Sequence, residues 1–357
     1  MFKYFKDLQE LKFNSETKIF PGLNGVKGLL ILVVVLTHCL PPSMVLYFLY
    51  FFHMPLFMGI SGFLLKRTAF QNGYMDYFKK VFHRLIIPWF IATVIFLPFR
   101  MSEAPVTPLS LYDSIYPYYH LWYIPSYVLA ATICFCILKW KFRVWPILLI
   151  TVLVTIVWYV IYRYPILPAN DASIFLLKYP VDIYKRSLVP VKELPLYWLG
   201  EKRVFSYIFF FITGFCLRNL FIENKLKLWH SIILIAASFV ALLFLIVNRF
   251  SNIITVWPYL IFNISLVILV VVYLAPQKWM QNKLFLKVNE LSLGIYLFHP
   301  LIQKLIYSLL NDREQTHHNF MGGVGIFTLV IIFTLGFILL LKKLNIADKY
   351  MLGNIKR

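Results

Sequence analysis

The chain has 357 residues, of which 61% are hydrophobic and 14% charged, so its composition excludes a soluble globular domain and indicates an integral membrane protein. A net charge of +20 would suggest nucleic-acid binding in a soluble protein, but here the Lys and Arg residues lie in short clusters between apolar runs. Such clusters set membrane topology, so we expect membrane lipids and no nucleic acid as partners. Neither a disulfide framework nor a metal site is indicated, because all the cysteines lie in apolar segments: Cys39, Cys134, Cys136 and Cys216.

The N-terminal residues 1–20 are mixed in charge and lack the apolar core and cleavage site of a signal peptide, which predicts a cytoplasmic extension. Apolar runs of about 17 to 22 residues follow, each long enough for a transmembrane helix. We therefore predict an all-α integral membrane protein, a polytopic bundle of about ten transmembrane helices. The predicted spans cover residues 23–40, 44–65, 82–99, 120–138, 144–161, 204–221, 229–247, 255–274, 289–309 and 321–341.

Ten spans place both termini on one side of the membrane. That side holds 24 Lys and Arg residues against 11 on the other, so both termini, including the tail 342–357, are predicted to be cytoplasmic. The long loop 162–203 is then outside, and its prolines and aromatic residues indicate a loop ordered against the bundle. No internal repeat is visible, so residues 21–341 are predicted to form one transmembrane domain.

The first span carries two ionisable side chains, Lys27 and His38, eleven residues apart. Eleven residues make just over three helical turns and a rise of about 16 Å, so both side chains project from one face. Ionisable groups at membrane depth are costly and indicate function. Histidine suits general base catalysis because its ordinary pKa lies close to neutral pH. The alternatives are a snorkelling anchor for Lys27 and a headgroup or carbonyl contact for His38.

A second histidine, His53, lies in the next span and either orients His38, relays protons or caps a kink before Pro55. In the same span, Ser61 lies in a G-I-S-G sequence without the spacing of a nucleophile elbow. We interpret Gly59, Ser61 and Gly62 as sites of close helix packing.

Further candidates are a basic cluster, an aromatic pair and a histidine in the ninth span. The cluster Lys79, Lys80 and Arg84 precedes the third span and is explained either by membrane anchoring or by phosphate binding. Trp122 and Tyr123 are typical of an interface belt, but near the outer mouth they can stack on a sugar. The ninth span is too polar for lipid on all sides, so it is expected to face the bundle interior. Its polar residues are Glu290, His299, Gln303 and Lys304, of which His299 is a secondary substrate-binding candidate.

Several motifs in order resemble the membrane-bound acyltransferase-3 family, whose usual first-span signature is R-x10-H. This chain has K-x10-H there, from Lys27 to His38, which is common in the carbohydrate O-acetylase branch that includes fucose-4-O-acetylase-like proteins. The resemblance runs from about Pro21 to Leu341. The other matching segments are FFHMPLFMGISGFLLKR, KKVFHRLIIPWF, HLWYIPSYVL, FSYIFFFITGFCLR and ELSLGIYLFHPLI.

The resemblance implies a multi-pass enzyme of the bacterial inner membrane. It implies O-acyl transfer, usually of acetyl from cytosolic acetyl-CoA, to a hydroxyl of a surface glycan or lipid-linked saccharide such as lipopolysaccharide O-antigen. The family's catalytic histidine corresponds to His38, its second-span histidine to His53 and its cation to Lys27. The basic cluster and Lys27 are then expected to hold the CoA phosphates, with no permanently bound cofactor and no metal. The residues of that basic cluster are Lys79, Lys80 and Arg84.

Three positions depart from the family pattern. Asn24 replaces an acidic residue that precedes the family cation, Val81 breaks the R-x-x-R motif that ends at Arg84, and Glu290 replaces a common glycine. Two alternatives remain open at the level of sequence. One is a lipid-linked glycan transporter or flippase with Lys27, His38 and Glu290 as proton-coupling groups. The other is the same enzyme with a succinyl donor, recognised by a deep basic residue such as Lys304 or Arg203.

Overall fold

The computed structural model describes most of the membrane-embedded chain. The described residues are 21–41, 43–103, 120–140, 144–162, 207–222, 228–247, 256–310 and 319–354. The predicted extension 1–20, nearly all of the long loop 162–203 (including Arg203) and the loop histidines His317 and His318 lie outside the described residues.

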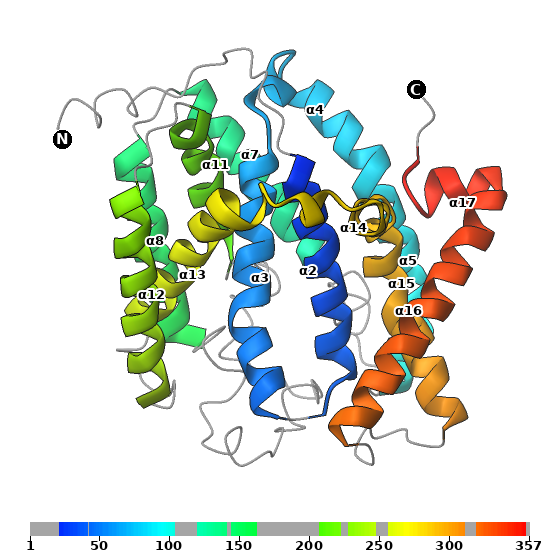
Figure 1. The fold of residues 1–357 in the computed structure, drawn as a ribbon. Coiled ribbons are helices and arrows are strands. Elements are labelled where there is room, and N and C mark those ends of the chain that lie inside the picture. Colours follow the sequence, from blue (N-terminus) through cyan, green and yellow to red (C-terminus); the bar gives the residue numbers. More distant parts are fainter. Residues whose placement is uncertain are drawn as a thin grey trace.

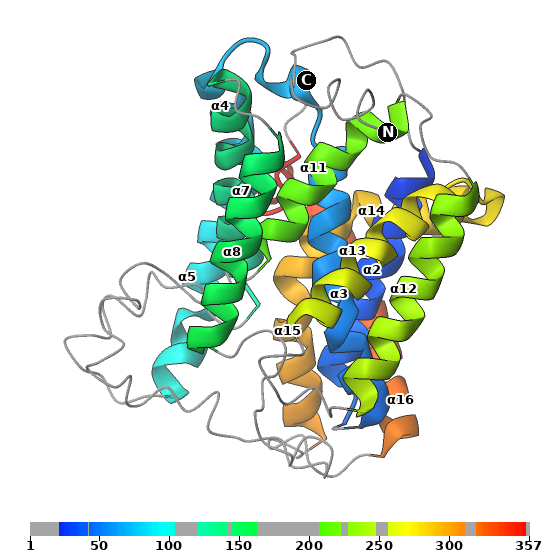
Figure 2. The ribbon, with the colours of Figure 1, turned by 90° about the vertical axis from the view of Figure 1, so that its left-hand side faces the viewer.

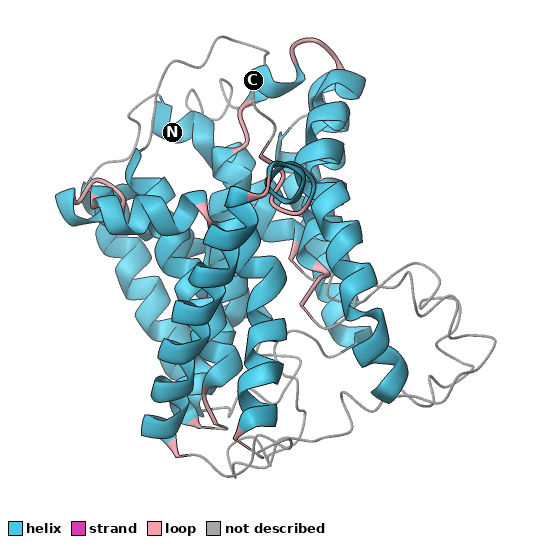
Figure 3. Ribbon diagram, turned by 90° about the vertical axis from the view of Figure 1, so that its right-hand side faces the viewer, coloured by secondary structure: helices cyan, strands magenta, loops and turns pink. Residues whose placement is uncertain are grey.

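Every element in the described part of the chain is a helix, as the sequence predicts (Figure 3). Lipid offers no hydrogen-bond partner to the backbone, so an apolar chain satisfies its N–H and C=O groups within helices. The helices of the first half are α2 (Pro21–Cys39), α3 (Met44–Leu64), η1 (Arg67–Phe70), α4 (Tyr74–Val81), η2 (Phe82–Ile86), α5 (Ile87–Glu103), α7 (Tyr123–Lys139) and α8 (Val144–Tyr162). Those of the second half are α11 (Ile208–Ile222), α12 (Leu228–Val247), α13 (Val256–Leu269), η7 (Val270–Leu274), η8 (Lys278–Gln281), α14 (Lys283–Glu290), α15 (Ser292–Leu309), α16 (Phe320–Lys343) and α17 (Asn345–Tyr350).

By length and composition, four helical stretches of the described chain can cross a membrane: Gly22–Cys39, Tyr74–Phe99, Val256–Leu274 and Phe320–Lys343. Shorter apolar stretches of 10–17 residues lie in α3, α7, α8, α11 and α12, within or close to predicted spans. The total of about ten spans stays a prediction.

Two predicted spans differ from the structure by more than a few residues at their ends. The third helix begins at Tyr74 rather than at residue 82, because the amphipathic α4 continues through the π-helical turn η2 into α5. The ninth predicted span is interrupted at Leu291, so Glu290 ends α14 and lies outside α15. In α15 itself, His299 and Gln303 are buried, as expected for a helix that faces the bundle interior.

The helices α2 and α3 lie side by side in the middle of the bundle (Figure 1). The helices α8, α11, α12 and α13 lie beyond α3, whereas α5, α15 and α16 lie on the side of α2 (Figures 1 and 2). The start of α2 and the end of α16 are at the same end of the bundle, together with α4 and α14 (Figure 1). This end therefore gathers the lysines of α4, α14 and α16.

Glycines allow α3 and α11 to pack backbone against backbone. A Cβ added at Gly62 would meet the carbonyl oxygen of Phe211, and one added at Gly214 would meet that of Gly59. The Ser61 hydroxyl between them lies 2.9 Å from the Tyr123 hydroxyl. The predicted close packing at Gly59 and Gly62 is therefore confirmed, and Ser61 fixes α7 against α3.

We expect Gly62→Ala to destabilise the bundle by about 1–3 kcal/mol, because the added methyl group overpacks a backbone contact. Thermal unfolding of the detergent-solubilised protein, followed by size-exclusion chromatography, measures the effect. The matched control is Gly336→Ala in α16, where an added Cβ has no atom within 4 Å. Equal melting temperatures for the two variants would contradict the close contact between α3 and α11.

Candidate active site

A cavity of about 600 Å³ lies between α2, α3, α4, η2, α7, α14 and α15. It brings together sequence-predicted residues from four distant parts of the chain. These are Lys27, His38, His53, Lys80, Arg84, Trp122 and Tyr123. Lys79 and His299 are not among the lining residues, although both lie on lining elements.

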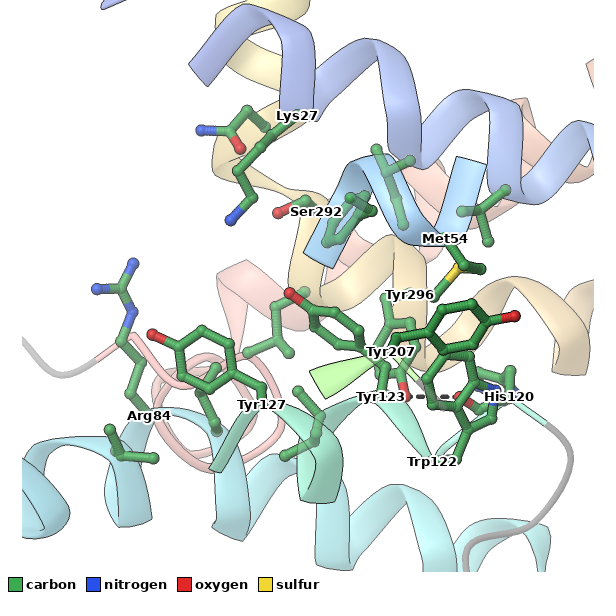
Figure 4. Close-up of a pocket in the computed structure, with 18 of the residues that line it drawn as sticks. Lys27, Met54, Arg84, His120, Trp122, Tyr123, Tyr127, Tyr207, Ser292 and Tyr296 are labelled. Carbon is green, nitrogen blue, oxygen red and sulfur yellow. Dashed lines mark hydrogen bonds between the residues drawn. The ribbon is translucent and has the colours of Figure 1, made fainter. Parts of the chain in front are cut away.

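One end of the cavity is cationic. Lys27 on α2 and Arg84 on η2 both lie at this end, well away from Trp122 and His120 (Figure 4). Lys80 precedes Arg84 by four residues and lines the same cavity. The ammonium nitrogen of Lys27 lies 5.5 Å from the centre of the Phe57 ring, a cation–π distance that steadies a charge inside an apolar bundle. Three cations around one opening suit the binding of phosphate groups.

The π-helical turn η2 affects where Arg84 points. Single π turns within α-helices are frequent at functional sites, because the extra residue changes which side chains face the neighbouring helices. In this turn Arg84 lines the cavity, whereas the adjacent His83 does not. The sequence gives no sign of the turn.

A carboxylate also lines the cationic end. The two Glu290 oxygens accept hydrogen bonds from Lys287 at 2.9 Å and from Lys342 at 3.1 Å. These bonds hold the pKa of Glu290 below its ordinary value. Glu290 therefore joins α14 to the end of α16 beside the cavity.

Histidines gather toward the other end. His38 is in the last turn of α2, and the side-chain amide of Gln303 donates a hydrogen bond to its main-chain carbonyl. His53 is buried, and its Nδ1 lies 2.6 Å from the Leu49 carbonyl oxygen. Because a carbonyl only accepts hydrogen bonds, Nδ1 carries the hydrogen and Nε2 of neutral His53 is the basic nitrogen.

His120 is a site residue that was not predicted from the sequence. This buried histidine lines the cavity, and its Nε2 lies 3.3 Å from the Leu297 carbonyl oxygen. The ring of His299 lies behind the cavity wall, 5.3 Å from that of His38 and 5.4 Å from that of His120. The signal that indicated His38, a lone histidine at membrane depth, applies equally to His120.

An aromatic wall borders the histidines. Trp122 stacks on Tyr207 with ring centres 5.2 Å apart, and it is only 5% exposed, so it belongs to the cavity rather than to an interface belt. The Tyr296 hydroxyl donates a 2.7 Å hydrogen bond to the His120 carbonyl. Tyr123 and Tyr127 also line the cavity (Figure 4). Such a wall offers flat apolar faces edged with hydroxyl groups.

The arrangement combines an anion-binding end with a basic end in one cavity. Among the described residues, no group of three His, Cys, Asp or Glu side chains is placed to hold a metal ion. The chemistry that these side chains can supply is the binding of a phosphate-bearing molecule and proton transfer by imidazole.

A family model described as an acyltransferase domain matches residues 20–343, nearly the whole chain. No curated protein and no solved structure matches the chain.

The Glu290 ion pairs predict a pH-dependent contribution to stability. Because the folded-state pKa of Glu290 is below its ordinary value of 4.5, the contribution is present at neutral pH and is lost as the pH falls through the lowered pKa. At pH 7, Glu290→Gln should lower the free energy of unfolding by at most about 1 kcal/mol, since these pairs are partly exposed.

Melting temperatures of the wild type and Glu290→Gln, measured from neutral to acidic pH, check this prediction. The difference should close on acidification and shrink in high salt, which screens exposed charges. A difference that widens at acidic pH would rule out stabilisation by the carboxylate.

Proposed function

This chain belongs to the acyltransferase-3 family and is a membrane acyltransferase, and from that membership we propose its donor and acceptor. The donor is cytosolic acetyl-CoA, and the acceptor is a hydroxyl of a cell-surface polysaccharide, such as lipopolysaccharide O-antigen or a related lipid-linked glycan. The observation that carries the proposal is that cations and histidines line opposite ends of the same cavity.

The donor is bound by its phosphate groups at the cationic end, by Lys27, Lys80 and Arg84. Arginine and lysine recognise phosphate by charge-assisted hydrogen bonds. Lys80 and Arg84 line the cavity and are exposed, so a donor that enters from solvent can reach them. With its phosphates held there, the acyl end of the donor extends along α2 toward His38. The eleven residues between Lys27 and His38 correspond to a rise of about 16 Å, a distance suited to an extended donor arm.

The transfer step uses His38 as general base. Its imidazole takes the proton from the sugar hydroxyl as the oxygen attacks the acetyl carbonyl carbon. The carbon–oxygen bond forms, the carbon–sulfur bond breaks, and the departing CoA thiolate receives the proton from the His38 imidazolium. The products are the O-acetyl sugar and free CoA, so atoms and charge balance without a further reactant. His53 donates its Nδ1 hydrogen to the Leu49 carbonyl, which leaves Nε2 as its basic nitrogen, and it orients His38 or relays the proton.

The acceptor sugar is held by the aromatic wall. Trp122 and Tyr207 offer a stacked face, and Tyr123 adds a hydroxyl group beside it. Aromatic side chains of this kind combine a flat apolar surface with a polar edge, which matches the two faces of a sugar ring.

Two observations bear on the alternative functions. A succinyl donor needs a cation near the histidines, but Lys304 places its ammonium nitrogen 5.1 Å from the centre of the Phe99 ring and does not line the cavity. The charged residues other than histidine in the described lining are Lys27, Lys80, Arg84 and Glu290, at the cationic end. An uncharged acetyl group is therefore favoured. Family membership favours the enzyme over the transporter or flippase.

We further propose a bacterial inner-membrane location, about ten spans and both termini in the cytoplasm. The lysines of α4, α14 and α16 support this orientation, because they gather at the end where α2 begins and cytoplasmic loops carry the excess of positive charge (Figure 1). The cationic end of the cavity is then open to cytosolic acetyl-CoA.

We expect His38→Ala to abolish acetylation, with a loss of at least about 100-fold, because it removes the general base. The test compares surface glycan from cells that express the wild type, the variant or no protein, at equal membrane levels. Base-labile O-acetyl groups are scored by NMR or mass spectrometry. Identical glycans from the wild type and the variant would refute the assignment of His38.

Removing a cation from the cavity should weaken donor binding. We expect Lys80→Ala and Arg84→Ala each to raise the KM for acetyl-CoA about 10-fold, the size of one charge-assisted hydrogen bond, with a smaller change in kcat. Initial rates with radiolabelled acetyl-CoA in membranes measure both parameters. Lys139→Ala is the matched control, because Lys139 is an exposed cation at the end of α7 and does not line the cavity. Equal effects of all three substitutions would indicate general surface charge instead.

A further inference from the structure

His299 lies directly behind His38, on the neighbouring helix α15. Its side chain is completely buried, it does not line the cavity, and its ring centre is 5.3 Å from that of His38. A side chain in this position does not reach the substrate across the cavity wall. Its effect on the reaction has to pass through a residue that does line the cavity.

The hydrogen bond that His299 makes fixes its tautomer. Nδ1 lies 2.7 Å from the carbonyl oxygen of Ile295, which only accepts hydrogen bonds, so Nδ1 carries the hydrogen. Nε2 of the neutral ring is therefore a bare acceptor. This nitrogen is buried and has no hydrogen-bond partner among the described residues. A buried acceptor is stabilised by a donor. The rings of His38 and His120 lie 5.3 and 5.4 Å from that of His299. Nε2 of His120 carries its hydrogen toward the Leu297 carbonyl, so the donor to His299 is His38.

The two rings are close enough for such a bond. A hydrogen bond between two imidazole nitrogens spans about 3 Å, and a centre-to-centre separation of 5.3 Å allows it when each ring turns a nitrogen toward the other. Catalytic hydrogen bonds are often loose in the absence of substrate and tighten when it binds.

The same helix also holds the backbone of His38. Gln303 is four residues after His299, so both side chains lie on one face of α15. Its buried amide donates a hydrogen bond to the main-chain carbonyl of His38. One face of α15 thus contacts both the ring and the main chain of the last turn of α2.

We propose that His299 is a positioning residue for His38. Its Nε2 accepts the N–H of one His38 nitrogen and thereby keeps the other His38 nitrogen unprotonated and directed into the cavity. When His38 takes the proton of the hydroxyl, both of its nitrogens carry hydrogens, and the bond to His299 stabilises the resulting cation. A base oriented by a third group is a recurring device in nucleophilic and acid–base catalysis. The inference rests on the function proposed above.

The test uses three substitutions of His299 in membranes supplied with radiolabelled acetyl-CoA and surface glycan. His299→Leu removes the acceptor, His299→Gln supplies an oxygen acceptor at about the same reach, and His299→Asn supplies one that is too short. We expect His299→Leu and His299→Asn to lower kcat about 10- to 100-fold with an unchanged KM for acetyl-CoA, because His38 is misplaced while the cationic end is intact. His299→Gln should recover a large part of kcat.

The matched control is His83→Leu, which changes an exposed histidine outside the cavity lining and should leave both parameters unchanged. Size-exclusion profiles and melting temperatures identify misfolded variants. If His299→Leu misfolds, the comparison of Gln with Asn decides the question.

Three results would overturn the proposal. The first is equal activity of the Gln and Asn variants. The second is a raised KM with unchanged kcat, which would make His299 a substrate contact. The third is wild-type kcat in His299→Leu. A wild type that itself transfers no acetyl group would instead count against the proposed function, so the two failures are distinguishable.

Discussion

An ionisable side chain placed at membrane depth has to find a polar neighbour or a polar cavity, because neither lipid nor an apolar helix face can solvate it. Lys27 and His38 satisfy this requirement together, since their common helix face borders one cavity. At the cationic end, the Phe57 ring contacts Lys27, and the Glu290 carboxylate bonds to Lys342. Around the histidines, the Leu49 carbonyl bonds to His53 and the Gln303 amide bonds to the main chain of His38. The other helices that line the cavity surround this face of α2, which carries Lys27 and His38.

Close packing of α2 against its neighbours fixes the position of the face that carries Lys27 and His38. On its opposite side, α2 presents Gly22, Gly25 and Gly28, where an added Cβ would meet the carbonyl oxygens of Ala275, Met280 and Phe285. Small residues allow helices to approach closely in membranes, where the hydrophobic effect gives little drive for association. The glycines thus set α2 firmly on η8 and α14, so Lys27 of α2 and Glu290 of α14 line the same cavity. One face of α2 therefore packs through its glycines, and the opposite face carries the two ionisable side chains of the cavity.

Much of this could be predicted from the sequence, and the exceptions have physical reasons. The spacing of Lys27 and His38 is a property of one helix, so their common face follows from helical geometry alone. The break at Leu291, the π turn that directs Arg84 and the burial of Trp122 depend on neighbouring helices, which local pattern does not reveal. Lys79 and Lys80 are adjacent and identical in type, and only the packing of α4 decides that Lys80 lines the cavity. His120 was within reach of sequence reasoning, by the rule that indicated His38.

In the mechanism that we propose, the donor occupies this cavity lengthwise, with its phosphates at the cations and its sulfur at His38. The most direct measurement is a cryo-electron microscopy structure of the protein in lipid nanodiscs with CoA bound. We expect phosphate oxygens within hydrogen-bond reach of Lys27, Lys80 and Arg84, and the thiol next to the imidazole of His38. CoA bound outside the cavity, or bound with its sulfur at the cationic end, would contradict it.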